Sequence, residues 1–179
     1  MKFTTLTAIA VALTTANALA MNRRAPTTCE EDLNAMDSQL DVVTKVSQAW
    51  TPADGYLGAL QAQLEANKLH GAIESATESC AYSRPVSSEK ADKFMRQVHD
   101  MIPRIESILD HFAAKKSDYD TVLLTTPLVK SNLQTTHAKT NALRNVVLNS
   151  TPESHRDQLE AYFNRINAAY DRVYGVYGR

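Results

Sequence analysis

The stretch SSEKADKFMRQVHDMIPRIESILDHFAAKKSDYD, residues 87–120, is the longest continuous amphipathic segment of the sequence. Its apolar residues recur at steps of three and four, which is the period of an α-helix with one buried face. Ser87 or Ser88 can cap the start of this helix. Pro103 predicts a kink and not a break. The segment therefore predicts a long helix against which the rest of the chain packs.

Short signals upstream and downstream mark the starts of other helices. Thr28-Cys29-Glu30-Glu31 has the form of a capping box. A threonine followed by a proline stands at 51–52, 126–127 and 151–152, and each pair predicts a cap with proline in the first turn. Apolar residues at helical spacing follow every one of these signals.

Five amphipathic helices and no strand candidate predict an all-α, antiparallel bundle. In the second helix the apolar residues of 57–64 and those of 69–80 follow two different registers, which predicts an irregular middle at 65–68. The sequence leaves open whether the third helix continues through 115–126. The tyrosines of the last helix are expected mostly in the core or at its boundary, with an adsorbing surface as the alternative.

The first residues have the form of a secretory signal peptide, expected at 1–20. An apolar run at 6–13 is followed by Ala18-Leu19-Ala20, small residues where a signal peptidase cuts, and the run is too short to span a membrane. A short processed or flexible segment is expected at 21–27 and a single helical domain at 28–177. The protein is therefore expected to be secreted, extracellular or in the cell wall.

Charge and cysteine usage narrow the class of protein. The net charge of −1 becomes more negative once Lys2, Arg23 and Arg24 are removed, which argues against nucleic-acid binding. The two cysteines of a secreted chain predict a disulfide between Cys29 and Cys80. Cys29 begins the first predicted helix and Cys80 lies near the end of the second, so an antiparallel pair of helices brings them together.

No pattern in the sequence predicts catalysis, a metal or a cofactor. There is no Gly-x-Ser-x-Gly motif, and no cysteine remains as a nucleophile if the disulfide forms. His70 and Glu74 could share an ion, but a solvated pair on one helix explains them better. The protein is therefore expected not to be an enzyme. Asn149-Ser150-Thr151 is a candidate N-glycosylation site.

The fourth predicted helix has polar groups on its apolar side: Thr136, His137 and Thr140. The favoured interpretation is that the threonines donate to carbonyls of their own helix. The alternative is that these groups meet the polar end of an apolar ligand held between helices. The candidate ligand contacts are the inward residues of the five helices: Leu40, Val43, Leu60, Leu64, Met101, Ile105, Leu133, Thr136, His137, Thr140, Phe163 and Ile166.

The order and spacing of several short motifs resemble the fungal hydrophobic surface-binding protein A family, which includes cell-wall galactomannoproteins. The motifs are Ala35-Met36-Asp37-Ser38-Gln39-Leu40, Ile73-Glu74-Ser75-Ala76, Ile102-Pro103-Arg104-Ile105 and Ala114-Lys115-Lys116-Ser117-Asp118-Tyr119-Asp120. The resemblance implies a secreted, non-enzymatic helical protein that adsorbs to hydrophobic surfaces. It also implies fatty-acid binding in the bundle and recruitment of secreted esterases.

The leading hypothesis is therefore a protein that binds a hydrophobic surface or a lipid such as a fatty acid, with a secreted esterase or a cell-wall component as a further partner. The alternative is an effector-like interaction protein whose polar faces bind a protein or a glycan.

Overall fold

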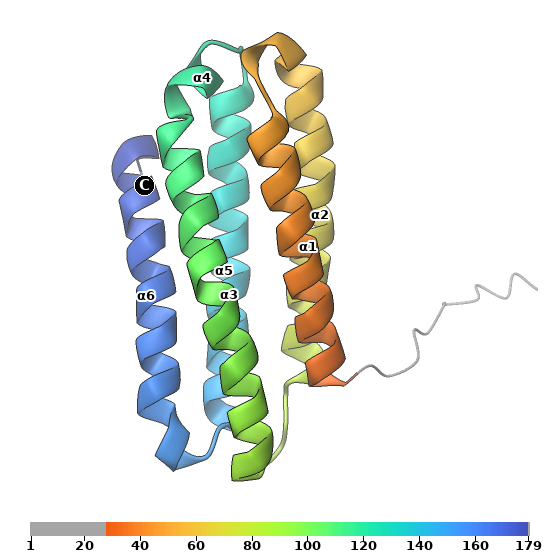
Figure 1. Cartoon of the computed structure of the whole chain (residues 1–179), viewed down its shortest axis with the longest axis vertical. Helices are drawn as coiled ribbons and strands as arrows, with labels where there is room; N and C mark the ends of the chain where they lie inside the picture. Colours follow the sequence, from red (N-terminus) through yellow and green to blue (C-terminus); the bar gives the residue numbers. More distant parts are fainter. Residues whose placement is uncertain (1–27, 179) are drawn as a thin grey trace, which may run out of the picture.

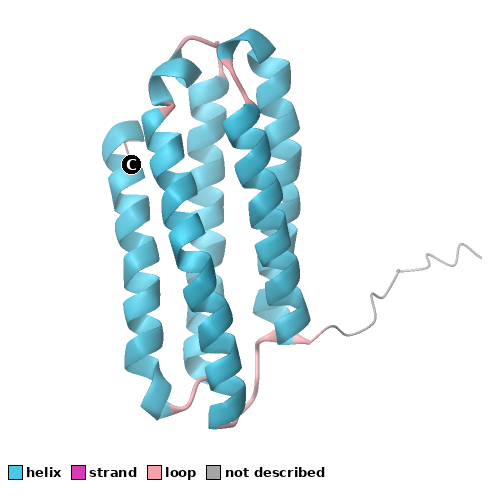
Figure 2. Cartoon of the chain, in the orientation of Figure 1, coloured by secondary structure: helices cyan, strands magenta, loops and turns pink. Residues whose placement is uncertain are grey.

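The computed structural model describes residues 28–178 and consists there of helices and their connections, with no strand (Figures 1 and 2). The expected all-α fold is confirmed. The expected leader at 1–20 and the segment 21–27 lie outside the described residues. The elements in order are α1 (Cys29–Ala49), η1 (Pro52–Asp54), α2 (Gly55–Ser79), α3 (Ser88–Ala114), α4 (Lys116–Asp120), α5 (Thr125–Ser150) and α6 (Glu153–Tyr177).

Two of the predicted helix starts carry the expected caps. Thr28 and Glu31 form the predicted capping box of α1, with the Glu31 amide donating to the Thr28 hydroxyl at 3.2 Å. The Ser87 hydroxyl accepts from the Lys90 amide at the start of α3. α3 then continues through Pro103 without a break.

The threonine–proline signals locate helix starts but not always the cap. Thr51 and Pro52 open η1, where the Asp54 carboxylate accepts from the Thr51 amide. α5 begins one residue before Thr126, whose hydroxyl donates instead to Asp120 at 2.6 Å. The Thr151 hydroxyl donates back to Val147 at the end of α5 and does not cap α6. The N-cap residues are Leu124 for α5 and Pro152 for α6, so the predicted role of Thr126 and Thr151 as caps was wrong.

The five long helices form a closed ring. Consecutive long helices run in opposite directions (Figure 1), as predicted. The packing order around the ring is α1, α2, α5, α6, α3 and back to α1. This order places some helices of the same direction side by side. Gln63 of α2 accepts from Asn132 of α5, and further along the same two helices Glu74 accepts from Lys139, so α2 and α5 are parallel neighbours.

α2 is one continuous helix, and the predicted irregular middle is absent. Its second half buries Leu69, Ile73 and Ala76. Because the helix is unbroken, the same buried face continues back through alanines at 59, 62 and 66. The leucines of 57–64 are thereby turned away from that face.

The core lies inside the ring and is closed at one end by a disulfide. Leu33, Ile102, Leu159 and Val173 are at most 1% exposed. The predicted bond between Cys29 and Cys80 is present and joins the start of α1 to the end of α2. No helix of the described residues has both the length and the apolar character needed to cross a membrane.

The tyrosines of α6 belong mainly to this core. Tyr170, Tyr174 and Tyr177 are all buried, and Tyr162 is partly buried against the core. The interpretation of these residues as core or boundary positions is therefore confirmed, and they do not offer an adsorbing surface.

Candidate functional site: an apolar cavity along the bundle axis

A cavity of about 130 Å³ lies between the helices. By a comparable measure a single water needs roughly 10–15 Å³, so this space is large for a protein core, which is normally close-packed. All five long helices line it, mostly with aliphatic and aromatic side chains. Its lining on α1 extends from Leu33 to Ser47, a length of about 21 Å along the helix axis. The cavity is therefore elongated and suited to an extended apolar chain.

Nine of the twelve candidate contacts line this cavity. They come from four helices that the sequence separates widely, and the fold brings them together around one space: Leu40, Val43, Met101, Ile105, Leu133, Thr136, Thr140, Phe163 and Ile166.

Three candidate contacts lie elsewhere. Leu64 is 61% exposed on α2, and Leu60 is half-buried one turn earlier on the same side. His137 is half-buried between α5 and α6. Its ring stacks on Tyr170 at 4.2 Å, and its Nε2 lies 3.0 Å from Asn167 Oδ1. None of the three lines the cavity.

A small polar wall interrupts the apolar lining where α2 meets α5. It consists of Gln63, Asn132, Thr136 and Thr140. The Asn132 side chain donates to Gln63, and the hydroxyls of Thr136 and Thr140 donate to the carbonyls four residues earlier, each at 2.8 Å. The favoured interpretation of the threonines as back-bonded residues is thus confirmed. Both also line the cavity, as the ligand hypothesis requires.

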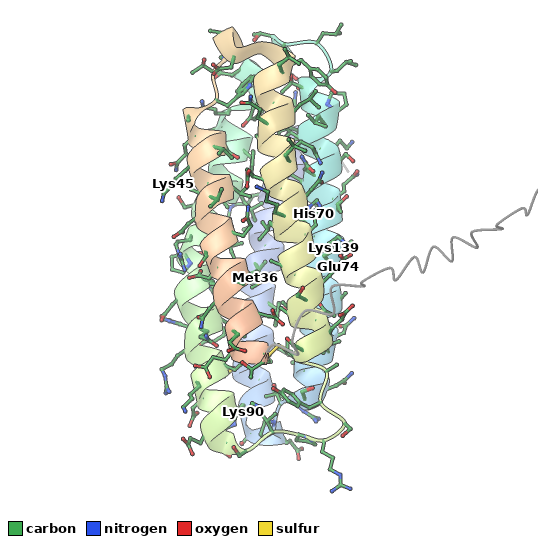
Figure 3. All side chains as sticks on the ribbon, turned by 90° about the vertical axis from the view of Figure 1, so that its right-hand side faces the viewer. Met36, Lys45, His70, Glu74, Lys90 and Lys139 are labelled. Carbon is green, nitrogen blue, oxygen red and sulfur yellow. A yellow bond between two sulfur atoms is a disulfide. The ribbon has the colours of Figure 1, made fainter. Side chains whose placement is uncertain are left out.

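His70 supports this wall from behind. Its Nε2 lies 2.8 Å from the Thr136 hydroxyl. Since that hydroxyl donates to the Asn132 carbonyl, it accepts from His70, which places the imidazole proton on Nε2. Burial lowers the pKa of His70 below 6.5. Lys139 lowers the pKa further and Glu74 opposes it. His70 is therefore neutral at pH 7. Figure 3 shows it beside Lys139 and Glu74 at the junction of α2 and α5.

Sequence reasoning missed an important part of the lining. The inward face of α2 carries Ala59, Ala62 and Ala66, whose small side chains leave the space unfilled. The spacing of three and four residues between these alanines could have indicated a buried face. Leu57, Leu60 and Leu64 have similar spacing and are more hydrophobic, so they are the residues that the sequence predicts to be buried. At the η1 end the cavity is bounded by Trp50 and Tyr119, whose ring centroids are 4.7 Å apart.

A ring of helices around an elongated apolar cavity defines the class: helical-bundle proteins with an internal apolar chamber. The chain belongs to the hydrophobic surface binding protein A family, whose model matches residues 26–149. No curated protein matches the sequence.

Solved structures share the fold at low sequence identity. The structure of Afmp4p in complex with palmitic acid has a TM-score of 0.79 and 23% identity, over 86% of this chain and all of that one. Ligand-binding domain 1 of the Penicillium marneffei MP1 protein, complexed with arachidonic acids, has a TM-score of 0.75 and 17% identity, over 83% and 95% of the two chains. Ligand-binding domain 2 of the same protein, complexed with multiple arachidonic acids, has a TM-score of 0.70 and 17% identity, over 84% of this chain and 92% of that one.

Proposed function

We propose that the protein is a secreted, non-enzymatic binder of long-chain fatty acids, which it holds in the cavity of the bundle. The single observation that carries this proposal is the elongated apolar cavity with one polar wall. Apolar pockets with a few placed polar groups are the usual form of small-molecule sites. The similar structures of Afmp4p and MP1 contain palmitic and arachidonic acids, which supports the same ligand class here.

The polar wall is the proposed position of the fatty-acid carboxyl group. A side-chain amide has two donor hydrogens. Asn132 uses one for Gln63, and Gln63 uses one for Asn67. One hydrogen of each amide is thus available to a carboxyl oxygen in the cavity. The acyl chain then lies against the seven apolar contacts among the nine named above, with Thr136 and Thr140 at its carboxyl end. The proposed binding set omits Leu60, Leu64 and His137.

The first experiment is native mass spectrometry of the secreted protein, followed by organic extraction and identification of the released compound. A fatty acid near one per chain supports the proposal. A bare protein that also fails to bind added palmitic acid would overturn it.

Variants of α2 and α5 locate the site. Ala66→Phe fills the cavity and is expected to abolish palmitic acid binding, whereas Ala142→Phe, at an exposed position of α5, is the matched control and retains it. Asn132→Leu is expected to weaken binding of the acid by roughly tenfold, as for one lost hydrogen bond to a charged group. It is expected to weaken binding of the uncharged methyl ester less, because an ester carbonyl accepts a weaker hydrogen bond than a carboxylate. Equal binding by wild type and Ala66→Phe would place the ligand elsewhere.

Secretion, glycosylation at Asn149 and recruitment of an esterase or a cell-wall component belong to the same proposal. Asn149 is exposed in the last turn of α5, so a glycan is sterically compatible with the bundle there. Affinity capture with immobilised protein, with and without palmitic acid, tests the partners. A stoichiometric protein or glycan that palmitic acid does not affect would favour the alternative of an interaction protein.

A further inference from the structure

Exposed leucines gather on two segments of the molecule. Among the described residues six large hydrophobic side chains are exposed, and four of them are leucines: Leu57 at 75%, Leu64 at 61%, Leu123 at 83% and Leu124 at 56%. Leu57 and Leu64 lie on the outward side of the first half of α2. Leu123 and Leu124 lie in the connection between α4 and α5. We call these four residues the leucine surface.

The two segments lie at the same end of the bundle. α2 and α5 are neighbours and parallel, and Gln63 contacts Asn132 near the beginning of both helices. The start of α2 and the connection that leads into α5 are therefore at one level, at the upper end in Figure 1. Leu124 has a φ of 68°, a left-handed conformation that is costly for leucine. The fold thus keeps an apolar side chain exposed at a position where glycine or asparagine would be less strained.

The leucine surface lies in segments without charge. Residues 55–64 (GYLGALQAQL) and 121–129 (TVLLTTPLV) contain no charged residue, although 22% of the whole chain is charged. Several charged side chains nearby have partners. The Asp54 carboxylate accepts from Thr51, and Lys116 pairs with Asp120 at 2.6 Å. Such a surface offers little attraction to an ionic partner and matches an uncharged apolar one.

The same two segments form the wall of the cavity on their inner side. Ala59, Ala62 and Gln63 line it from α2, and Leu128 and Val129 line it from α5. A single layer of helix therefore separates the leucine surface from the cavity. Contact at this face would bring a hydrocarbon-like surface next to the chamber.

We propose that the leucine surface is the face by which the protein adsorbs to an extended, uncharged hydrocarbon surface. The family's description as hydrophobic surface binding proteins fits such a partner, and the uncharged, leucine-rich segments place the contact on this end of the molecule. The inference goes beyond fatty-acid binding and does not depend on it, because adsorption does not require an occupied cavity.

The test is depletion of the protein from solution onto silica particles coated with octadecyl chains. The variant Leu57→Gln/Leu64→Gln/Leu123→Gln/Leu124→Asn removes the leucine surface. Its adsorption is expected to fall roughly tenfold or more, because burial of even part of several leucines is lost. Binding of palmitic acid in solution is expected to stay unchanged, which separates a failure of this inference from a failure of the proposed function.

The matched control replaces four exposed apolar residues outside these segments. It is Val42→Gln/Ala138→Gln/Ala142→Gln/Ala161→Gln, and its adsorption is expected to equal that of the wild type. Far-UV circular dichroism checks that each variant is folded. The single change Leu123→Gln, at the most exposed of the four leucines, serves if the fourfold variant does not fold.

Three results would overturn the inference. The first is equal adsorption by the wild type and the variant without the leucine surface. The second is adsorption that weakens strongly with added salt, which would indicate an ionic contact. The third is a wild-type dimer that this variant converts to a monomer while adsorption is kept, which would make the leucine surface a contact between copies of the chain.

Discussion

At the scale of single residues, the positions that matter are those where a side chain or the backbone is held in a costly state. Leu124 has a positive φ, and His70 is buried where the loss of solvation outweighs the stabilisation of its protonated form by Glu74. Neither state follows from hydrophobic spacing, because spacing specifies which face is buried and not the backbone angles or the solvation of one group. Each gives a prediction about stability.

Leu124→Gly is expected to stabilise the protein by about 1 kcal/mol. A left-handed conformation costs a non-glycine residue about 1–2 kcal/mol, and the greater freedom of glycine in the unfolded chain returns part of that gain. Thermal or urea unfolding measures the change. Leu123→Gly is the control, since Leu123 does not have a positive φ, and it is expected to give no gain. Equal effects of both changes would contradict this account.

His70 is expected to make stability depend on pH. Its pKa in the folded protein lies below 6.5 because burial disfavours the charged form. The unfolded state therefore binds more protons between the two pKa values, and the free energy of unfolding falls as pH is lowered from about 7.5 through 6.5 toward the folded pKa. Melting temperatures of the wild type and His70→Gln measure this, with exposed His99→Gln as the control. If the melting temperature of His70→Gln depends on pH in the same way as that of the wild type, His70 is not the group responsible.

At the scale of helices, caps and registers decide where each element begins and which side it buries. The capping box at Thr28 and the cap at Ser87 could be predicted because they are local hydrogen bonds between near neighbours in sequence. The register of α2 could not. Leu57, Leu60 and Leu64 gave one stripe and the residues from Leu69 onward another, and both stripes have helical period. Only the packing of the second half of α2 against α1 and α5 determines that the stripe from Leu69 onward is the buried one.

The disulfide between α1 and α2 is expected to stabilise the folded protein. Cys29 and Cys80 are buried and bonded across the closed end of this pair. Replacing both by alanine is expected to lower the free energy of unfolding by about 4 kcal/mol, the value for a crosslink that closes a loop of this length. Helical content at room temperature should remain. The control is addition of reductant to this variant, which should change nothing. A melting temperature equal to that of the wild type would mean that the bond contributes little.

At the scale of the whole molecule, the unfilled cavity lowers the stability of the fold. The atoms that line an empty cavity lack van der Waals contacts on one side, and a ligand that fills the cavity supplies these contacts. Palmitic acid is expected to raise the melting temperature, because a ligand that binds only the folded state stabilises it by about 2.7 kcal/mol at a hundred times its Kd. Ala66→Phe should show a smaller rise or none. A shift of the same size in both proteins would contradict binding in the cavity.

Periodicity and neighbours along the chain were sufficient to predict the helical class, the disulfide, most helix starts and nine residues that line the cavity. The tertiary structure alone decided the ring order, in which α2 lies parallel to α5 and α3 closes the ring against α1. It also decided that alanines of α2 face the cavity while leucines face outward. The physical reason is that one straight helix can bury only one face, and the partners on either side choose which.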